Sequence, residues 1–162
     1  MGRISAIDDF KKDPLLAQAV GDMVIAWSRA DIALFSTFAR IAGIRLNMAM
    51  ESWSRIPTFE SRTKFLHGLL QEWDTKEFDG GAISRSIEKL SRLAKTRNGW
   101  VHGDWCYDED QKIFVVFNHR LHPTHKERGK PVKVNEVATH CQALRVAYRE
   151  LEKLIKSHDL QP

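Results

Sequence analysis

Three residues in one short segment carry side chains that together can act on a phosphate group. The segment TRNGWVHGDW spans residues 96–105 and contains Arg97, Asn98 and His102. A guanidinium grips phosphate through two parallel N–H donors and stays charged. An imidazole, with an ordinary pKa of about 6.5, can take up or release a proton near neutral pH. Packing alone does not call for this combination of side chains.

The reaction that these residues can support is cleavage of RNA by its own 2′-hydroxyl. The hydroxyl attacks the adjacent phosphate and displaces the 5′-oxygen, so the step needs a base, an acid and a cation. His102 is the candidate base or acid, and Arg97 is the candidate cation for the phosphorane charge. Asn98 lies four residues before His102, so on a continuing helix the two share a face. Asn98 is therefore expected to orient the imidazole or to bind phosphate.

The element that must position these residues is a helix, predicted over residues 82–100. Its apolar stripe consists of Ile83, Ile87, Leu90 and Ala94. At about 100° per residue, Arg97 and Val101 extend this stripe and Asn98 borders it. A guanidinium on the inward face is costly unless it meets an acid, a partner subunit or a ligand. The position of Arg97 is thus as informative as its identity.

The spacing of Arg97 and His102 poses a geometric problem. Five residues apart, they lie about 140° apart around an ideal helix. Both can face one phosphate if the helix ends between them, where Gly99 weakens it, or if two subunits contribute to one site. A symmetric dimer also accounts for an inward-facing Arg97, and a homodimer is predicted. The alternatives are a structural ion pair of Arg97 with Asp31 or Glu60, and an ordinary turn at the helix end.

Around this helix the sequence predicts a mostly α fold. A long helix begins at Asp13-Pro14, with Asp13 as N-cap, and ends near Gly43. Glycines 80 and 81 are predicted to form a turn. The other expected elements are helices in 46–56 and 58–73 (capped by Thr58), a hairpin in 105–117, a polar basic loop in 118–131, and a closing helix in 135–158 capped by Asn135.

The composition suits one ordinary globular domain, expected to cover residues 1–162. Hydrophobic residues make up 43% and charged residues 28% of the 162, and the net charge of +4 fits an anionic partner such as nucleic acid. No apolar run approaches the roughly 18 residues of a membrane span. The first residues lack an apolar signal core, so the cytoplasm is the expected compartment. Cys106 and Cys141 are expected to be free buried thiols.

The motif and its setting resemble the HEPN superfamily of small α-helical bundles, which are often ribonuclease toxins or nucleotide-associated domains. The signature of that family is an Arg, four to six residues, and a His at the C-terminal end of a helix. An Asn, Asp or His commonly follows the Arg, and small residues follow the His. The segment RNGWVHG matches with Arg97, Asn98, His102 and Gly103.

The resemblance implies a HEPN-like bundle of four to five helices with a small β-hairpin before the last helix. It also implies a metal-independent endoribonuclease that leaves a 2′,3′-cyclic phosphate, uses no cofactor and dimerises so that two motifs line one cleft. Such a protein would be a toxin or phage-defence effector, with an antitoxin as candidate partner. The alternatives are a non-catalytic HEPN-like module that binds a protein or nucleotide, and a structural helical protein without a ligand.

Several basic residues are candidate contacts to an RNA backbone, with solvated side chains as the alternative. They are Arg62, Lys95, Arg120, Lys126 and Arg128. Asp31 is expected either to support the motif or to form an ion pair within the bundle. A solvated face is the simpler explanation for the cations of the predicted motif helix, namely Arg85, Lys89, Arg92 and Lys95.

Two further groups of residues near these segments are candidates for binding a metal or a base. The histidines at three-residue steps are not expected to hold zinc, because Pro123 breaks the helix that would align them. They are His119, His122 and His125. The two tryptophans that flank the motif can stack on an unpaired base or pack in the protein. They are Trp100 and Trp105.

Overall fold

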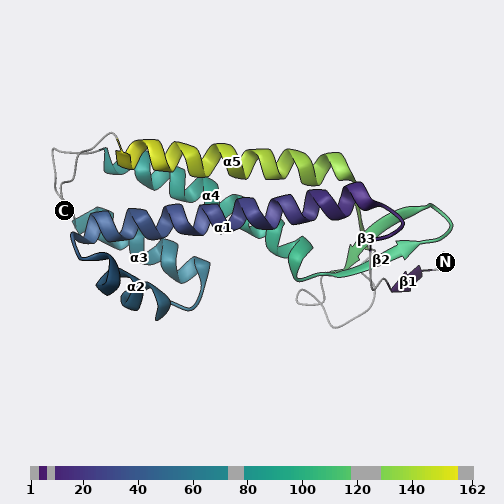
Figure 1. The fold of residues 1–162 in the computed structure, drawn as a ribbon, viewed down its shortest axis with the longest axis horizontal. Coiled ribbons are helices and arrows are strands. Elements are labelled where there is room, and N and C mark those ends of the chain that lie inside the picture. Colours follow the sequence, from purple (N-terminus) through teal and green to yellow (C-terminus); the bar gives the residue numbers. More distant parts are fainter. Residues whose placement is uncertain (1–3, 7–9, 73–78, 118–128, 157–162) are drawn as a thin grey trace. The chain divides into compact units, whose positions relative to one another are not determined.

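The computed structural model describes residues 4–6, 10–72, 79–117 and 129–156. These residues form five helices and four short strands, so the protein is mostly helical (Figure 1). The predicted fold class is confirmed, including the hairpin before the last helix. In chain order the elements are β1 (Ile4–Ala6), α1 (Pro14–Ala42), α2 (Leu46–Ser54), α3 (Phe59–Glu72), α4 (Gly80–Val101), β2 (Asp104–Asp108), β3 (Ile113–Phe117), β4 (Lys130–Val132) and α5 (Val134–Lys156).

Helix α1 begins and ends where the local sequence predicts. The carboxylate of Asp13 accepts a hydrogen bond from the backbone amide of Leu16 at 3.0 Å, which satisfies one of the free amides at the helix start. At the other end, Gly43 adopts a φ of +60°, a left-handed conformation that glycine takes without steric penalty. Helix α3 is likewise capped as predicted, by the hydroxyl of Thr58, which accepts from the amide of Ser61 at 3.0 Å.

Two predicted helix boundaries were wrong. Glycines 80 and 81 form the first turn of α4 and not a separate turn, because the carboxylate of Asp79 caps this helix and accepts from the amide of Ala82 at 2.8 Å. Helix α5 begins before Asn135. The carboxylate of Glu136 accepts from the amide of Lys133 at 3.1 Å, so a capping box closes the helix start two residues before the predicted cap.

The described chain divides into two compact units. The first contains residues 1–24 and 93–142, and the second contains residues 25–92 and 143–162. Helices α1, α4 and α5 contribute to both units. The expectation that residues 1–162 form one domain stays a prediction, and each unit is described here by itself.

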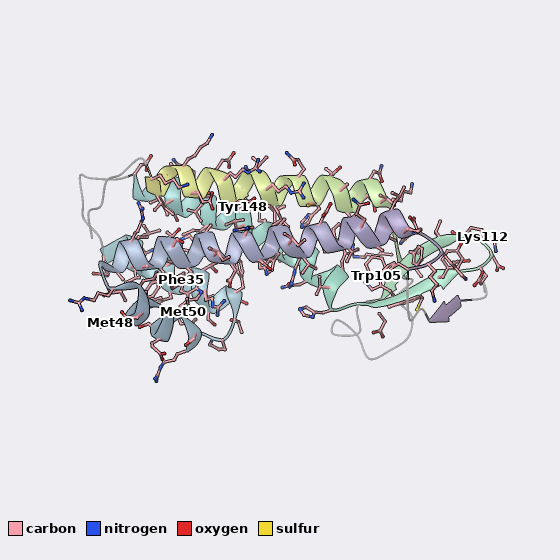
Figure 2. The ribbon with its side chains drawn as sticks, viewed as in Figure 1. Phe35, Met48, Met50, Trp105, Lys112 and Tyr148 are labelled. Carbon is pink, nitrogen blue, oxygen red and sulfur yellow. The ribbon has the colours of Figure 1, made fainter. Side chains whose placement is uncertain are left out.

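The first unit contains an antiparallel sheet with strand order β1-β2-β3-β4. Strands β2 and β3 pair from Asp104 opposite Phe117 to Asp108 opposite Ile113, and Figure 2 shows Trp105 and Lys112 near the two ends of this hairpin. Strands β1 and β4 were not predicted, because each is only three residues long and too short for a periodic pattern. The ring of Phe10 packs against Trp105 with ring centroids 5.1 Å apart.

The second unit is helical. In Figure 1, α2 and α3 lie beside the C-terminal half of α1. The ring of Trp53 on α2 stacks on Phe38 of α1 at a centroid distance of 5.4 Å, and Phe59 on α3 packs on Trp27 at 4.6 Å. Burial of such aromatic and aliphatic side chains is the main stabilising contribution to a core of this kind. The largest buried side chains of this unit include Leu34, Leu66, Ile87, Leu90, Leu144 and Leu151.

Two further predictions concern the cysteines and membrane-spanning helices. Cys106 and Cys141 are both free thiols, as predicted; Cys141 is buried and Cys106 is partly buried. None of the helices in the described ranges is long and apolar enough to cross a membrane.

Candidate functional site

The candidate motif lies on the last turns of α4 and just beyond them. The amide of His102 donates to the carbonyl of Asn98 at 3.0 Å, which closes the last turn of α4. The helix ends at Val101, between Arg97 and His102, as the first of the two explanations for their joint action requires. Gly99 itself lies inside α4, two residues before its end at Val101. The cooperation of two subunits stays a prediction.

Gly103 sets the direction in which the chain leaves the motif. A Cβ atom at this position would lie 2.3 Å from Cγ1 of Val116 and 2.5 Å from the backbone oxygen of Gly99. It would also lie 3.0 Å from the backbone oxygen of Phe117. Only glycine permits this approach, since real Cβ atoms do not come so close to backbone oxygens. The end of α4 is therefore held closely against strand β3 of the same unit.

Arg97, which was predicted to extend the inward-facing stripe of this helix, is partly buried. Its Nη1 donates to the side-chain oxygen of Asn98 at 2.9 Å. Burial lowers the pKa of the Arg97 guanidinium, which nevertheless stays protonated because the ordinary value is so high. The predicted role of Asn98 in orienting the imidazole has a concrete competitor, because its amide oxygen already accepts from Arg97.

His102 is exposed, directly after the last residue of α4. Among the described residues, none forms a hydrogen bond with its imidazole. Its backbone is fixed by the bond to Asn98, whereas its ring nitrogens are open to solvent or to a ligand. Such a ring is suited to proton transfer with a bound molecule.

A histidine that sequence reasoning missed lies on the same side of α4 as Arg97. His140 of α5 contacts the ring of Trp100 edge-on, with centroids 5.2 Å apart, and hydrogen-bonds to the backbone of Leu93. Leu93, Arg97 and Trp100 follow one another at helical spacing, so His140 is level with Arg97. The signal was its place one residue before Cys141 and three after Val137, at the border of the buried stripe of α5.

The imidazole of His140 is poorly accommodated as a charged group. Its Nε2 is buried without a hydrogen-bond partner among the described residues. Burial lowers the pKa of His140, and the bond to the backbone of Leu93 opposes this shift to a smaller extent. The neutral form of His140 is therefore favoured.

Asp31 and Arg62 form an ion pair in the second unit. Arg62 Nη1 donates to both carboxylate oxygens of Asp31, at 2.9 and 3.1 Å, and its Nε donates to the carbonyl of Ile56 at 3.0 Å. The guanidinium also lies over the ring of Trp53, 5.1 Å from the centroid. For Asp31 this corresponds to the predicted alternative of an ion pair within the bundle. Arg62 is likewise occupied by protein groups, although it was proposed as an RNA contact.

The other predicted site residues are one exposed lysine, two packed tryptophans, and basic residues and histidines that lie outside the described ranges. Lys95 is exposed on α4. Both tryptophans beside the motif pack in the protein: Trp105 Nε1 donates to the carbonyl of Trp100 at 2.8 Å. Arg120, Lys126 and Arg128 lie outside the described residues, as do His119, His122 and His125. Within the described ranges, no group of three His, Cys, Asp or Glu side chains is arranged to hold a metal ion.

With this geometry established, the chain was compared with known proteins. No protein-family description, no curated protein and no solved structure matches it. The features that point to a function are therefore the motif and the helix that carries it.

Proposed function

We propose that the chain is a HEPN-like, metal-independent endoribonuclease. The observation that carries this proposal is the central place of Asn98. Its side-chain oxygen accepts from Arg97 at 2.9 Å, and its backbone carbonyl accepts from the amide of His102 at 3.0 Å. A phosphate-binding cation and an exposed imidazole are thus tied to one residue at the end of one helix.

The proposed reaction needs only proton transfer and charge stabilisation. The 2′-hydroxyl loses its proton and attacks the adjacent phosphorus, the bond to the 5′-oxygen breaks, and that oxygen receives a proton. The products are a 2′,3′-cyclic phosphate and a free 5′-hydroxyl. His102 acts as base or acid, and Arg97 stabilises the negative charge that develops on the phosphorane. Asn98 holds the guanidinium in position.

We propose a homodimer as the active form. Helix α4 is continuous through Val101, and residues five apart point about 140° apart on such a helix. His102 lies just beyond this helix, so the angle of an ideal helix does not by itself bring the two side chains of one chain together. In a symmetric dimer the motif of a second copy can supply the missing side chain. Cytoplasmic RNA is the expected substrate, with a toxin or phage-defence role and an antitoxin as a candidate partner.

The test is cleavage of total RNA and transfer RNA in EDTA by the wild-type protein and by His102→Ala. Loss of the proton-transfer group should slow cleavage about 100- to 10,000-fold. The matched control is His67→Ala, which removes a histidine that bonds to Ser84 at 2.8 Å in the second unit. Fragments that end in cyclic phosphate, made by wild type and His67→Ala but not by His102→Ala, are expected. Equal cleavage by all three proteins would overturn the assignment.

A mixing experiment tests the composite site. Arg97→Ala and His102→Ala chains with different affinity tags are co-expressed, and the mixed dimer is isolated through both tags. If one subunit supplies Arg97 and the other His102, the mixed dimer retains one complete site and about half of the wild-type activity. A mixed dimer as inactive as either parent, or a protein that is monomeric by light scattering, would contradict the dimeric arrangement.

A second candidate function is a non-catalytic module that binds a partner protein. The observation that favours it is the exposure of large apolar side chains on α2, where Leu46, Met48 and Met50 are 64%, 56% and 52% exposed; Figure 2 labels the two methionines. Methionines are frequent on surfaces that bind several partners. This reading predicts no RNA cleavage by folded wild-type protein, and a loss of partner binding in Met48→Lys, which leaves the motif unchanged.

A further inference from the structure

A groove between the N-terminal half of α4 and the C-terminal half of α5 gathers basic side chains in the second unit. Its volume is about 520 Å³. The polar residues along it are Arg85, Ser86, Lys89, Arg92, Glu150 and Lys153. Four of these six carry a positive charge and one a negative charge. Three of the four α4 cations expected on a solvated face, Arg85, Lys89 and Arg92, thus form one wall of this groove.

The cations of α4 follow the length of this groove. Arg85, Lys89 and Arg92 lie at steps of four and three residues, so they share a helix face and extend over about 10 Å. Lys89 Nζ lies 2.7 Å from Oε2 of Glu150, which links the two walls. Arg85 and Arg92 are exposed, and Arg85 lies within 3.8 Å of the Asp79 carboxylate. A row of this length matches several anionic groups in succession and not one small ion.

Ser86 is the second, independent observation. Its residue is only 7% exposed, and its Oγ is buried without a hydrogen-bond partner among the described residues. A buried hydroxyl without a partner is destabilising and uncommon in native proteins. Because Ser86 lines the groove among the cations, a small movement of the side chains that cover its Oγ would let a ligand oxygen complete its hydrogen bonding. The hydroxyl is a donor that phosphate oxygens accept.

We propose that this groove binds a ligand with two or three consecutive phosphate groups. Lys89, Arg92 and their neighbours neutralise the phosphates, and Ser86 Oγ donates to one of the phosphate oxygens. A free polyphosphate or nucleotide and the backbone of an RNA strand share this chemistry. The proposal does not depend on RNA cleavage by the motif.

The test measures binding of tripolyphosphate by calorimetry and of a short single-stranded RNA by fluorescence anisotropy. The His102→Ala protein is the background, so that the proposed nuclease cannot consume the RNA. Lys89→Ala and Arg92→Ala should each weaken binding about 3- to 10-fold. The matched control is Lys64→Ala, which removes a lysine that also lies 2.7 Å from a glutamate but outside the groove. It should change binding less than about twofold.

Two substitutions in the groove should act with opposite signs. Glu150→Gln removes the negative charge that competes with the ligand, so it should tighten binding about threefold. Ser86→Ala should weaken binding about 3- to 10-fold while it raises the melting temperature of the free protein, because an unpaired hydroxyl is replaced by the best helix former. A purely structural serine would not separate these two effects.

The two probes identify the source of the phosphates. Weaker binding of both probes in Lys89→Ala and Arg92→Ala supports a general phosphate site. A loss confined to the RNA supports the same site with an RNA strand as ligand, and the slope of log affinity against log salt should then fall by about 0.7 for each cation removed. Unchanged binding of both probes in Lys89→Ala, Arg92→Ala and Ser86→Ala would overturn the proposal, whatever the result of the cleavage assay.

Discussion

Arg62 and Arg97 are two partly buried arginines whose surroundings differ in kind. In the second unit, Arg62 donates to both oxygens of Asp31 and to the carbonyl of Ile56, and it lies over the ring of Trp53. In the first unit, Arg97 donates to the neutral amide of Asn98, and burial is the effect that shifts its pKa. Arg62 is paired with a carboxylate, whereas Arg97 bonds to an uncharged amide and lies where burial disfavours its charge.

This difference separates a structural arginine from one suited to bind an anion. A guanidinium paired with a carboxylate has already exchanged its hydration for protein contacts, and a phosphate would have to displace the acid. A partly buried guanidinium such as that of Arg97 attracts an incoming anion more strongly than an exposed one, because less water screens its charge. The following predictions test whether the two regions differ in this way, beginning with the largest effect.

The shape of the motif region should depend most strongly on Gly103. Gly103→Ala places a Cβ 2.5 Å from a backbone oxygen and 2.3 Å from Val116, so the end of α4 or strand β3 must shift. We expect a loss of about 2–4 kcal/mol in the free energy of unfolding, measured by urea titration. Cleavage should fall as well, because the last turn of α4 moves.

The matched control for this substitution is Gly99→Ala on the same helix. A Cβ at Gly99 meets nothing within 4 Å, and the residue lies inside α4, so alanine should stabilise the protein by about 0.5–1 kcal/mol. Cleavage should persist, because the structure does not use Gly99 to end the helix. If Gly99→Ala abolished cleavage without loss of stability, helix interruption at this point would have to be part of the mechanism.

The two arginines themselves should respond in opposite ways. Arg62→Ala leaves Asp31 without its partner and uncovers Trp53, so we expect a loss of about 1–3 kcal/mol in stability, with cleavage per folded molecule unchanged. Arg97→Ala should change stability by less than about 1 kcal/mol, because it also relieves a desolvated charge. Its cleavage should fall about 100-fold or more, since charge stabilisation of the transition state is lost.

Denaturant titrations and single-turnover cleavage of the same preparations measure both effects. Asp31→Asn is the companion variant, and it should destabilise the protein less than Arg62→Ala because the amide can still accept from Arg62. The comparison fails if Arg62→Ala reduces cleavage as strongly as Arg97→Ala at full folding.

The sequence predicted what short-range chemistry determines. The caps at Asp13 and Thr58 involve amides three residues away, and the hairpin strands flank an acidic turn, so both follow from local patterns. The stripe of α4 was equally readable, because Ile83, Ile87 and Leu90 recur at helical spacing and are buried.

What the sequence did not reveal are contacts between distant segments. Arg62 meets Asp31 across 31 residues, and His140 meets Trp100 across 40, so no local pattern marks either pair. Strands β1 and β4 exist only because longer neighbours offer backbone partners. The sequence shows the cations of the groove as charged residues of α4, but it does not show which residues of α5 face them. The cap of α5 lies at Lys133 and not at the predicted Asn135. The position was missed because both residues are polar and either could begin the helix.

The smallest predicted effect concerns His140, the neighbour of Arg97. Burial places the pKa of His140 in the folded protein below the ordinary value of 6.5, so near pH 6 the unfolded chain binds more protons than the folded one. Stability should therefore be fully present above about pH 6.5 and should fall as the pH drops toward the lowered pKa, by at most about 1.4 kcal/mol per pH unit. His140→Gln removes this titration, so its stability should decline less between pH 7 and pH 5 than that of the wild type. Urea titrations at several pH values measure the difference. Parallel curves for the two proteins would mean that burial does not disfavour the charged imidazole of His140, and this account of the first unit would then be wrong.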